Sequence, residues 1–440
     1  MAETYEDKVD LVKLNKERTY INSISEKDDG KSVTIAGWIY DDRELGKIKF
    51  IVLRDMTGEI QITGFRGETN DEVFKLMGKI PRESVIVVKG KIKKAAKAPG
   101  GREMAPESIE VLARAEHPLP IDVSDFSKTE LPKRLDYRFL DLHRRRAQAI
   151  FKVQSTIVQA YHEFMTKEGA IEAQFPSIIS ASSEGGTEVF KAKYFEKEVY
   201  LSQSCQLYKQ MLACSMEKVF AVFTVWRAEK HNTVRHLNES RQFDYEQAFA
   251  DEFVVMDVLA RAVQHIVKEV LDKNAKELEL LGVKLKVPDV KYFTFKEVAE
   301  MMKGKAHVGK DDLSGESEQE LGKMFPETIV FVHDWPLAGK PFYIMPKGKD
   351  SSRGFDAIYR GMEISSGGQR IHIPELLIER LKAKGMNPDN FEKYIESFRY
   401  GAPPHAGFGI GVERITMLIL GLANIREAVL FPRDRDRLTP

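Results

Sequence analysis

The stretch from residue 226 to 246, WRAEKHNTVRHLNESRQFDYE, constrains the fold more than any other part of the chain. It predicts a hairpin, because charged residues at both ends enclose a polar segment. In an extended strand the side chains at i and i+2 share a face, so Arg227 and Glu229 should point the same way, as should Asp244 and Glu246. Such a hairpin presents cations suited to phosphate oxygens beside carboxylates that accept from an amino group. ATP bound beside an amine would satisfy both, although a salt-bridged surface hairpin fits the charges taken alone.

Three segments together resemble the motifs of the class II aminoacyl-tRNA synthetases, and of their archaeal and eukaryotic aspartyl branch in particular. WRAE, NTVRHLNE and FDYE are similar to motif 2. KEGAIEAQFPSII at residues 167–179 is similar to motif 1, with Pro176 at its fixed proline, and GFGIGVER at residues 407–414 is similar to motif 3. The resemblance extends essentially from end to end. The combination is specific, whereas any one motif would be weak.

Length and composition set further limits. A chain of 440 residues should form two or three domains. Its 67 basic and 67 acidic residues balance, so any contact with nucleic acid must come from local patches. Cys205 and Cys214 lack a metal-type spacing and indicate neither a disulfide framework nor a zinc site. No apolar run approaches the ~18 residues of a membrane span, and we expect a cytoplasmic protein.

Five segments near the N-terminus predict short strands, because they are rich in β-branched residues and separated by turn signals. Five short strands in about 115 residues favour an OB-fold β-barrel, whose open face binds single-stranded nucleic acid. We therefore expect an α+β protein: an OB-fold at residues 1–116, a hinge at 117–140, and a class II catalytic domain at 141–440 with an antiparallel sheet flanked by helices. The predicted strands are residues 33–40, 47–55, 59–65, 84–94 and 108–112.

The resemblance implies that the barrel binds the tRNA anticodon. Phe50 and Gln61 match the aromatic residue that stacks on the central uridine and the amide that reads it, and Arg43 matches a residue that contacts the backbone. A core position is the alternative for Phe50. In that family, two further positions differ between enzymes that charge only tRNA(Asp) and enzymes that also charge tRNA(Asn). These positions are Tyr40 and Pro99 here. Pro99 matches the pattern of enzymes that charge both tRNAs, and Tyr40 matches the pattern of neither group. We therefore expect both tRNAs to be charged.

Apolar residues recur every three or four positions from 150 to 165 and predict a helix with one apolar face. By resemblance, this helix and the following strand form a homodimer interface. The paired glycines of SSEGGTEVF, residues 182–190, predict either a mobile loop that carries Glu184 or a simple surface turn. The resemblance places Glu184 near the ammonium group of a bound amino acid.

YLSQSCQLYKQMLACSM predicts a strand that runs into a helix from about Gln206. Gln206 and Lys209 lie three residues apart and share one side of that helix. The stretch resembles QSPQLxKQ of the aspartyl branch, whose glutamine and lysine bind the substrate, although Cys205 replaces the proline. The buried side of the helix is expected to carry Leu207, Met211 and Cys214.

GFDAIYRGMEISSGGQRIH, residues 354–372, carries two further carboxylates. If its hairpin turns at residues 359–360, Asp356 and Glu363 are directly opposed, and two repelling carboxylates predict a bound cation. An exposed acidic pair is the alternative. The resemblance implies magnesium ions that bridge ATP phosphates, with Ser366 nearby. Arg370 suits bidentate recognition of a carboxylate. Residues 250–340 show helical periodicity and charged loops, without a catalytic signature.

The glycine-rich segment at residues 407–414 predicts a strand entering a helix that begins near Arg414. By resemblance, it clamps ATP. One departure concerns adenine, because Ser240 occupies the place where the family often has a stacking aromatic residue. Phe243 or Arg241 would then have to substitute.

The resemblance implies an aspartate-tRNA ligase that uses ATP and Mg²⁺. The carboxylate of aspartate is already ionised at neutral pH, so catalysis should rest on positioning and charge stabilisation. The alternatives are an asparagine-tRNA ligase, a paralogue that makes free asparagine, and a non-catalytic nucleic-acid-binding protein. The charge of a buried Arg370 would be uncompensated if it faced a neutral amide, which speaks against an asparagine-tRNA ligase.

The residues implied to act fall into four groups. The catalytic residues are Arg227, Glu229 and Arg414, and those binding aspartate are Glu184, Ser204, Gln206, Lys209, Arg227, Asp244, Ser366, Arg370 and His405. The residues binding ATP are Arg227, Ala228, Glu229, Arg235, His236, Leu237, Glu363, Gly411, Val412, Glu413 and Arg414. The metal ligands are Asp356, Glu363 and Ser366.

Overall fold

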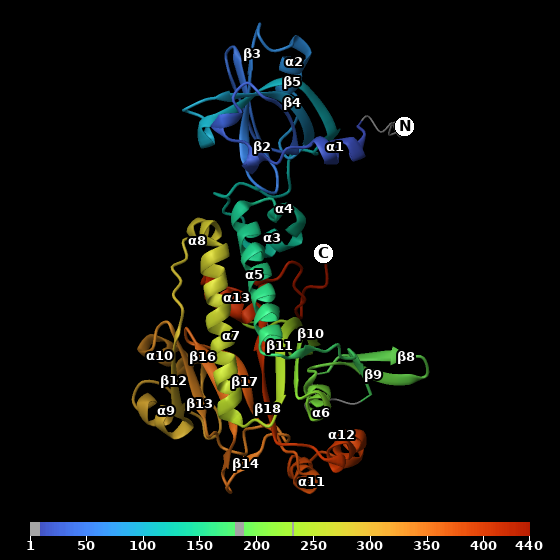
Figure 1. Ribbon diagram of the computed structural model, residues 1–440, viewed down its shortest axis with the longest axis vertical. Coiled ribbons are helices and arrows are strands. Elements are labelled where there is room, and N and C mark those ends of the chain that lie inside the picture. Colours follow the sequence, from blue (N-terminus) through green and yellow to red (C-terminus); the bar gives the residue numbers. More distant parts are fainter. Residues whose placement is uncertain (1–8, 181–188, 231–232) are drawn as a thin grey trace. The chain divides into compact units, whose positions relative to one another are not determined.

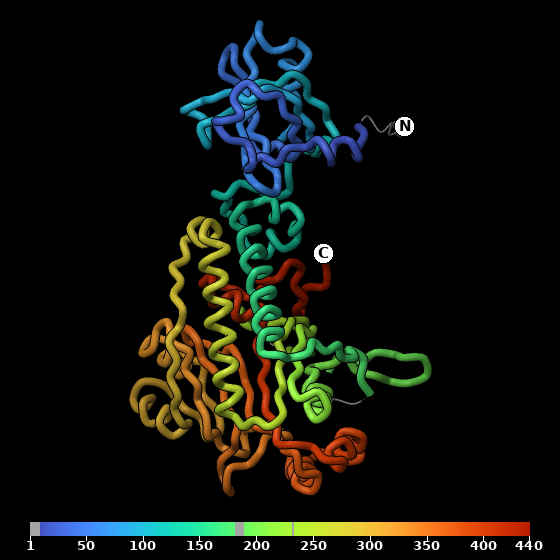
Figure 2. Tube along the Cα trace, in the orientation of Figure 1, coloured from blue at the N-terminus to red at the C-terminus, as the bar shows by residue number. Residues whose placement is uncertain are grey.

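The computed structural model describes residues 9–180, 189–230 and 233–440. The chain forms two compact units, Met1–Pro120 and Ile121–Pro440, drawn in Figures 1 and 2. Each unit has its own hydrophobic core. Within the described ranges, no helix is both long and apolar enough to cross a membrane.

The first unit is a closed five-stranded barrel in the order β1-β2-β3-β5-β4, which confirms the predicted OB-fold. Its strands alternate between buried apolar and more exposed residues, as in β2, because successive side chains point to opposite faces. The fifth strand begins six residues before its predicted start. Pro106 does not interrupt it, because this proline lies next to an irregularity in the pairing of β4 with β5, where proline is tolerated. The elements are α1 (Leu11–Glu17), η1 (Ile21–Ser23), η2 (Glu26–Asp28), β1 (Ser32–Leu45), β2 (Ile48–Arg54), β3 (Glu59–Phe65), α2 (Asp71–Met77), β4 (Val85–Lys94), η3 (Pro99–Gly101) and β5 (Arg102–Ala113).

The second unit is built on an eight-stranded sheet in the order β12-β13-β16-β17-β18-β11-β10-β6. The predicted antiparallel pairing is confirmed in the centre. Both edge pairs, β12 with β13 and β6 with β10, are parallel. Helices connect β12 to β13, and such a crossover is what a parallel pair requires. The strands are β6 (Ile171–Glu172), β10 (Lys218–Trp226), β11 (Glu239–Ala248), β12 (Asp289–Thr294), β13 (Thr328–His333), β16 (Gly354–Tyr359), β17 (Met362–Gln369) and β18 (His405–Gly411).

Two long helices, α5 (Arg145–Lys167) and α7 (Glu252–Lys273), pack side by side against this sheet (Figure 1). On α5, Tyr161 stacks on Phe243 of β11 at 4.1 Å between ring centroids, and its hydroxyl donates to the carbonyl of Asp244 at 3.0 Å. The helices thus bury one face of the sheet and leave polar residues of β11 on the other.

The remaining elements of the second unit are short. The helices are α3 (Leu131–Asp136), α4 (Arg138–Asp141), α6 (Gln206–Met216), α8 (Ala275–Leu281), α9 (Phe295–Met302), α10 (Gly315–Met324), η4 (Pro388–Phe391), α11 (Pro374–Ala383), α12 (Glu392–Ser397), η5 (Phe398–Tyr400), α13 (Val412–Leu420) and η6 (Ile425–Ala428). The strands are β7 (Ile178–Ile179), β8 (Lys191–Tyr194), β9 (Lys197–Leu201), β14 (Pro346–Lys347) and β15 (Ser351–Ser352).

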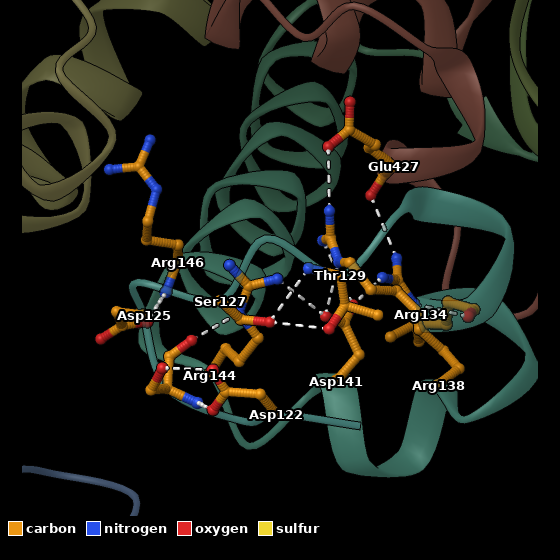
Figure 3. Close-up of polar contacts among 12 residues, drawn as sticks. Asp122, Asp125, Ser127, Thr129, Arg134, Arg138, Asp141, Arg144, Arg146 and Glu427 are labelled. Atoms are coloured by element: carbon orange, nitrogen blue, oxygen red, sulfur yellow. Dashed lines mark hydrogen bonds and ion pairs between the residues drawn. The ribbon is translucent and has the colours of Figure 1, made fainter. Parts of the chain in front are cut away.

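Residues 121–140, most of the predicted hinge, belong to the second unit. Figure 3 shows the arginine cluster that holds them, with Asp141 at its centre. The buried Asp141 carboxylate accepts from Arg134 Nε at 2.8 Å, Arg138 Nη1 at 2.6 Å and Arg144 Nη1 at 3.3 Å. Arg138 also donates to the carbonyls of Glu427, Val429 and Leu430. Ion pairs rather than an apolar stripe hold this segment, which is why hydrophobic periodicity did not indicate its helices.

Candidate active site

A cavity of 340 Å³ opens on the uncovered side of the central strands of the sheet. Its walls come from the loop after β10, from β11 and β17, and from the junction of β18 with α13. Most of the residues expected to bind aspartate, ATP or metal meet here, although they lie far apart in the sequence. They are Ser204, Gln206, Lys209, Arg227, Glu229, Arg235, His236, Leu237, Asp244, Glu363, Ser366, Arg370, Gly411, Glu413 and Arg414.

A buried cluster of four charges forms one end of this cavity. Lys209 Nζ lies 2.8 Å from Asp244 Oδ1 and 3.5 Å from Glu246 Oε2. Arg370 binds Glu246 through two hydrogen bonds. Burial alone would raise the pKa of Glu246, but the charges of Arg370 and Lys209 outweigh it and lower that pKa. The cluster therefore sets two cationic side chains, Lys209 and Arg370, against two carboxylates.

Two atoms beside the charge cluster lack a hydrogen-bond partner among the described residues. They are Asp244 Oδ2 and Gln206 Nε2, and both are buried. An unpaired buried polar group costs free energy, so such groups are expected to meet a ligand. A carboxylate oxygen suits an ammonium group and an amide N–H suits a carboxylate. An α-amino acid carries both groups.

The alternation of β11 decides which of its residues reach the cavity. Ser240 and Asp244 line it, whereas the odd-numbered Arg241 and Phe243 point to the opposite face. Phe243 is buried under α5, and the guanidinium of Arg241 donates to Glu413 Oε1 at 3.0 Å. The prediction that Phe243 or Arg241 contacts adenine is therefore wrong for the geometry described.

The β16–β17 hairpin differs from its predicted register. It turns at Arg360 and Gly361, both with positive φ, and an irregularity follows between Ala357 and Ile358. Glu363 therefore pairs with Ile358, and the prediction that Asp356 and Glu363 are directly opposed is wrong. The φ angles explain the shift, because a two-residue turn with positive φ at both positions favours Gly361 over Tyr359 as a central residue.

Asp356 and Glu363 nevertheless influence each other. Burial is the larger cause that raises the pKa of Glu363, and the charge of Asp356 raises it further. Asp356 does not line the cavity, and its Oδ2 accepts from Lys340 Nζ at 2.6 Å. Lys340 thus holds the positive charge nearest to Asp356 in the part of the chain that is described.

The other end of the cavity is rich in arginine. Arg414 Nη1 donates to the carbonyl of Glu363 at 2.8 Å, and Arg235 Nη1 lies 3.8 Å from Glu318 Oε2. Among the described residues, Arg227 forms no side-chain hydrogen bond or ion pair and remains available to a ligand. Three guanidinium groups around one space fit a polyphosphate.

Residues 425–435 hold the loop between β10 and β11. Each contact uses a carbonyl of one segment and a donor of the other, so the loop's backbone is fixed at several points. The donor and acceptor pairs are Asn238 N to Arg433 O at 2.9 Å, Ile425 N to Val234 O at 2.9 Å, Arg426 Nη1 to Thr233 O at 2.9 Å, and Arg435 Nη1 to Lys230 O at 3.0 Å.

Comparisons with known proteins match both units. Residues 33–112 match the family model described as OB-fold nucleic acid binding domain. Residues 130–435 match the model described as tRNA synthetases class II (D, K and N). The chain belongs to this class II tRNA synthetase family.

Full-length relatives of this synthetase are curated under two names. The aspartate–tRNA(Asp/Asn) ligase of Archaeoglobus fulgidus is 47% identical over 430 residues, covering 96% of this chain and 100% of the relative. The aspartate–tRNA(Asp) ligase of Pyrococcus horikoshii is 45% identical over 433 residues, with 96% and 99% covered. Among solved structures, asparaginyl-tRNA synthetase from Pyrococcus horikoshii superposes with a TM-score of 0.90 at 34% identity, covering 96% of this chain and 100% of that chain.

A few predicted site residues of the synthetase lie away from the cavity. Ala228, Val412 and Asp356 do not line it, and Glu184 falls outside the described residues. His405 lies behind the cavity, where its Nδ1 meets the carbonyl of Pro403 at 2.9 Å and its ring stacks on Phe398. On α6, Gln206 and Lys209 are buried, whereas Leu207, Met211 and Cys214 are half-buried. The deeper side of that helix is therefore the polar one, because it faces the cluster.

Glu318 and Lys340 were missed, although both belong to the synthetase's charged centre. Each stands in or beside the region 250–340, in which no catalytic signature is recognised. Burial, and next the charge of Glu363, raises the pKa of Glu318 to about 7. Single charged residues carry no periodic or motif signal, so tertiary structure alone brings them to the site.

The residues expected to contact the anticodon are distributed over the barrel. Phe50 is half-buried and lies outside the core cluster, which disfavours the core alternative. Gln61 donates to Glu103 Oε2 at 2.9 Å, and the exposed Arg43 pairs with Asp41. Tyr40 lies under the guanidinium of Arg54, and the exposed Pro99 begins η3. Their roles in tRNA binding stay predictions.

Proposed function

We propose that this class II tRNA synthetase is an aspartate–tRNA ligase. The observation that carries the proposal is the end of the cavity where Lys209 and Arg370 stand beside the unpaired atoms Asp244 Oδ2 and Gln206 Nε2. Asp244 would accept from the ammonium group of aspartate, while Gln206, Lys209 and Arg370 would face carboxylate oxygens.

The reaction needs no protein nucleophile. An oxygen of the α-carboxylate of aspartate attacks the α-phosphorus of ATP, the bond to the bridging oxygen breaks, and pyrophosphate leaves. A hydroxyl of the terminal ribose of tRNA then attacks the acyl carbon, and AMP leaves. Arg227, unpaired among the described side chains, would offset charge that develops on the α-phosphate, and Arg235 and Arg414 would bind the other phosphates.

Glu363, Asp356 and Ser366 would hold Mg²⁺, because their hard oxygen donors suit that ion. The raised pKa of Glu363, caused by burial and by Asp356, fits the loss of charge repulsion when a cation binds. Bound Mg²⁺ would supply charge neutralisation to the phosphates. Lys340 donates to Oδ2 of Asp356 at 2.6 Å and would share that carboxylate with the ion.

Aspartate and asparagine need separate consideration. The charge argument against asparagine does not hold, because Glu246 already compensates Arg370. An asparagine-tRNA ligase is therefore the second candidate to test, because the Pyrococcus horikoshii asparaginyl enzyme shares this fold. The names of the more similar full-length relatives support aspartate.

Finer properties are part of the same proposal. The barrel would bind the anticodon, and both tRNA(Asp) and tRNA(Asn) would be charged. Two copies would associate through α5 and β6, where Ile171 is half exposed. The enzyme would act in the cytoplasm.

ATP–pyrophosphate exchange tests the amino-acid assignment. Aspartate should support exchange with a kcat/KM at least about a hundredfold above that for asparagine, a preference worth roughly 2.7 kcal/mol. Equal or reversed preference would contradict the proposal and favour the second candidate. A chain with no exchange for either amino acid would not be a synthetase of this specificity at all.

A further inference from the structure

Glu318 of α10 lies between two parts of the site to which ATP is assigned. Its Oε2 is 3.8 Å from Arg235 Nη1 on the loop after β10. The same oxygen accepts from the backbone N–H of Glu363 on β17 at 3.4 Å. Its side chain is only 17% exposed. One carboxylate thus links the loop that carries Arg235 to the strand that carries Glu363.

Close packing fixes the helix that carries this carboxylate. Gly322 of α10 lies so near the backbone of Gly361, in the β16–β17 turn, that a Cβ on Gly322 would overlap it. At the other end of α10, the hydroxyl of Ser314 caps the helix by accepting from Ser317 N at 3.2 Å. Glu318 is therefore presented from a helix held at its start and against the hairpin that carries the proposed metal ligands.

The first turn of α10 also approaches Arg235. A Cβ on Gly315 would stand 3.5 Å from Arg235 Nη1, so the guanidinium lies against the backbone there. At 3.8 Å, Glu318 attracts this guanidinium without forming a bidentate pair. Its remaining donors stay available to phosphate oxygens, because an arginine has five N–H groups.

We propose that Glu318 is a positioning residue for ATP, which holds Arg235 toward the triphosphate before the nucleotide arrives. The proposal rests on the proposed function in that Arg235 binds ATP. Arginine has a large rotamer entropy, and a side chain that is ordered beforehand loses less on binding. Arg235 and Arg414 both act to lower the pKa of Glu318, so their charges offset part of the charge that this carboxylate would present to the nucleotide.

A double-mutant cycle on ATP binding tests this role. Isothermal titration of ATP into the full chain should show that Glu318→Gln weakens binding by about three- to tenfold, the range expected for one ion pair that positions a ligand group. The exposed Glu316 of the same helix provides the matched control, and Glu316→Gln should bind like the unmodified chain. In an Arg235→Ala background, Glu318→Gln should have no further effect, because nothing remains to be positioned.

Three results would overturn the proposal: unchanged binding in Glu318→Gln, tighter binding, or an equal loss with Arg235 already removed. Thermal denaturation checks that the variants are folded. If Glu318→Gln does not fold, Glu318→Asp replaces it, because the shorter side chain keeps the charge but moves it away from Arg235. Unchanged ATP affinity in Glu318→Asp would equally contradict the positioning role. ATP binding is measured without amino acid, so failure of aspartate-dependent exchange in the unmodified chain would refute the proposed function separately.

Discussion

Arg370 and Glu246 form a bidentate ion pair, with Nε to Oε1 at 2.8 Å and Nη2 to Oε2 at 3.1 Å, and both side chains are buried. Removing one partner of such a pair leaves a buried charge without compensation, whereas replacing both does not. Arg370 therefore has a structural partner in addition to its proposed substrate, and its two roles can be separated.

Arg370→Gln should lower both stability and aspartate activation. Glu246 would keep only Lys209 as a cationic partner, at 3.5 Å, and the loss in the free energy of unfolding should approach about 3 to 5 kcal/mol. Adding Glu246→Gln should restore much of that stability but not kcat/KM for aspartate, because the cation that faces the substrate is still missing. Denaturant unfolding and pyrophosphate exchange measure the two effects. Full activity in the double variant would remove Arg370 from the aspartate site.

Glu363→Gln should abolish adenylate formation at ordinary magnesium concentrations. The amide keeps the shape but removes the charge that attracts the cation, so the site binds magnesium more weakly and raised magnesium should restore part of the exchange. Binding of tRNA by the barrel should remain nearly intact, since Glu363 belongs to the other unit. The opposite pattern, with exchange preserved and tRNA binding lost, would mean that the chemistry is assigned to the wrong unit.

Asp141→Asn should change the acid stability of the second unit. Burial would raise the pKa of Asp141, but the hydrogen bond and charge of Arg134, with Arg138, lower it below its ordinary value of 3.8. A carboxyl whose pKa is lowered by folding contributes stability above its unfolded pKa, and loses it as the pH falls through the folded value. The variant should therefore lose about 3 to 5 kcal/mol at pH 7 and show a flatter decline below about pH 4.

The control for that variant is Asp136→Asn. Asp136 is 57% exposed and pairs with Arg437 at 2.8 Å, so its loss should cost less than about 1 kcal/mol. Urea unfolding at pH 7 and at several lower values gives both profiles. Equal losses in the two variants would show that the three arginines do not depend on Asp141.

Pro99→Lys should shift charging toward tRNA(Asp). Pro99 is exposed at the start of η3 and has no N–H, whereas a lysine there could donate to a base edge. One such contact discriminates by roughly 1 to 3 kcal/mol. Aspartylation of the two purified transcripts decides it. A preference of the unmodified chain for tRNA(Asp) of about a hundredfold or more would contradict the expected charging of both.

The barrel and the pattern of β11 were predictable because one face of each strand is buried and the other is not. The same rule failed for β13, TIVFVH, in which five successive residues are buried. A strand covered on both faces has no alternation and cannot be told by periodicity from a buried helix. Between residues 250 and 340, β13 was missed in this way, whereas the other missed strand, β12, is a partly exposed strand at the edge of the sheet.

Local rules predicted the side-chain positions at the site only where the residues concerned lie within one strand or one helix. The i, i+2 rule correctly put Asp244 and Glu246 on one face, and helical spacing put Gln206 beside Lys209. Counting across a hairpin failed for Asp356 and Glu363, because a turn at Gly361 and an irregular pairing shift the register. Glu318 and Lys340 reach the site through packing between distant segments, which no local pattern encodes.

The contacts from residues 425–435 to the loop after β10 also have a consequence for the order of synthesis. Chains are made from the N-terminus, and domains fold as their residues emerge from the ribosome. A nascent chain that has reached residue 400 already contains Arg227 and Arg235, but not the carbonyls and side chains that fix their loop. On the proposed function, nucleotide chemistry would be withheld until residues 425–435 have been translated, and products terminated before them should be unable to consume ATP.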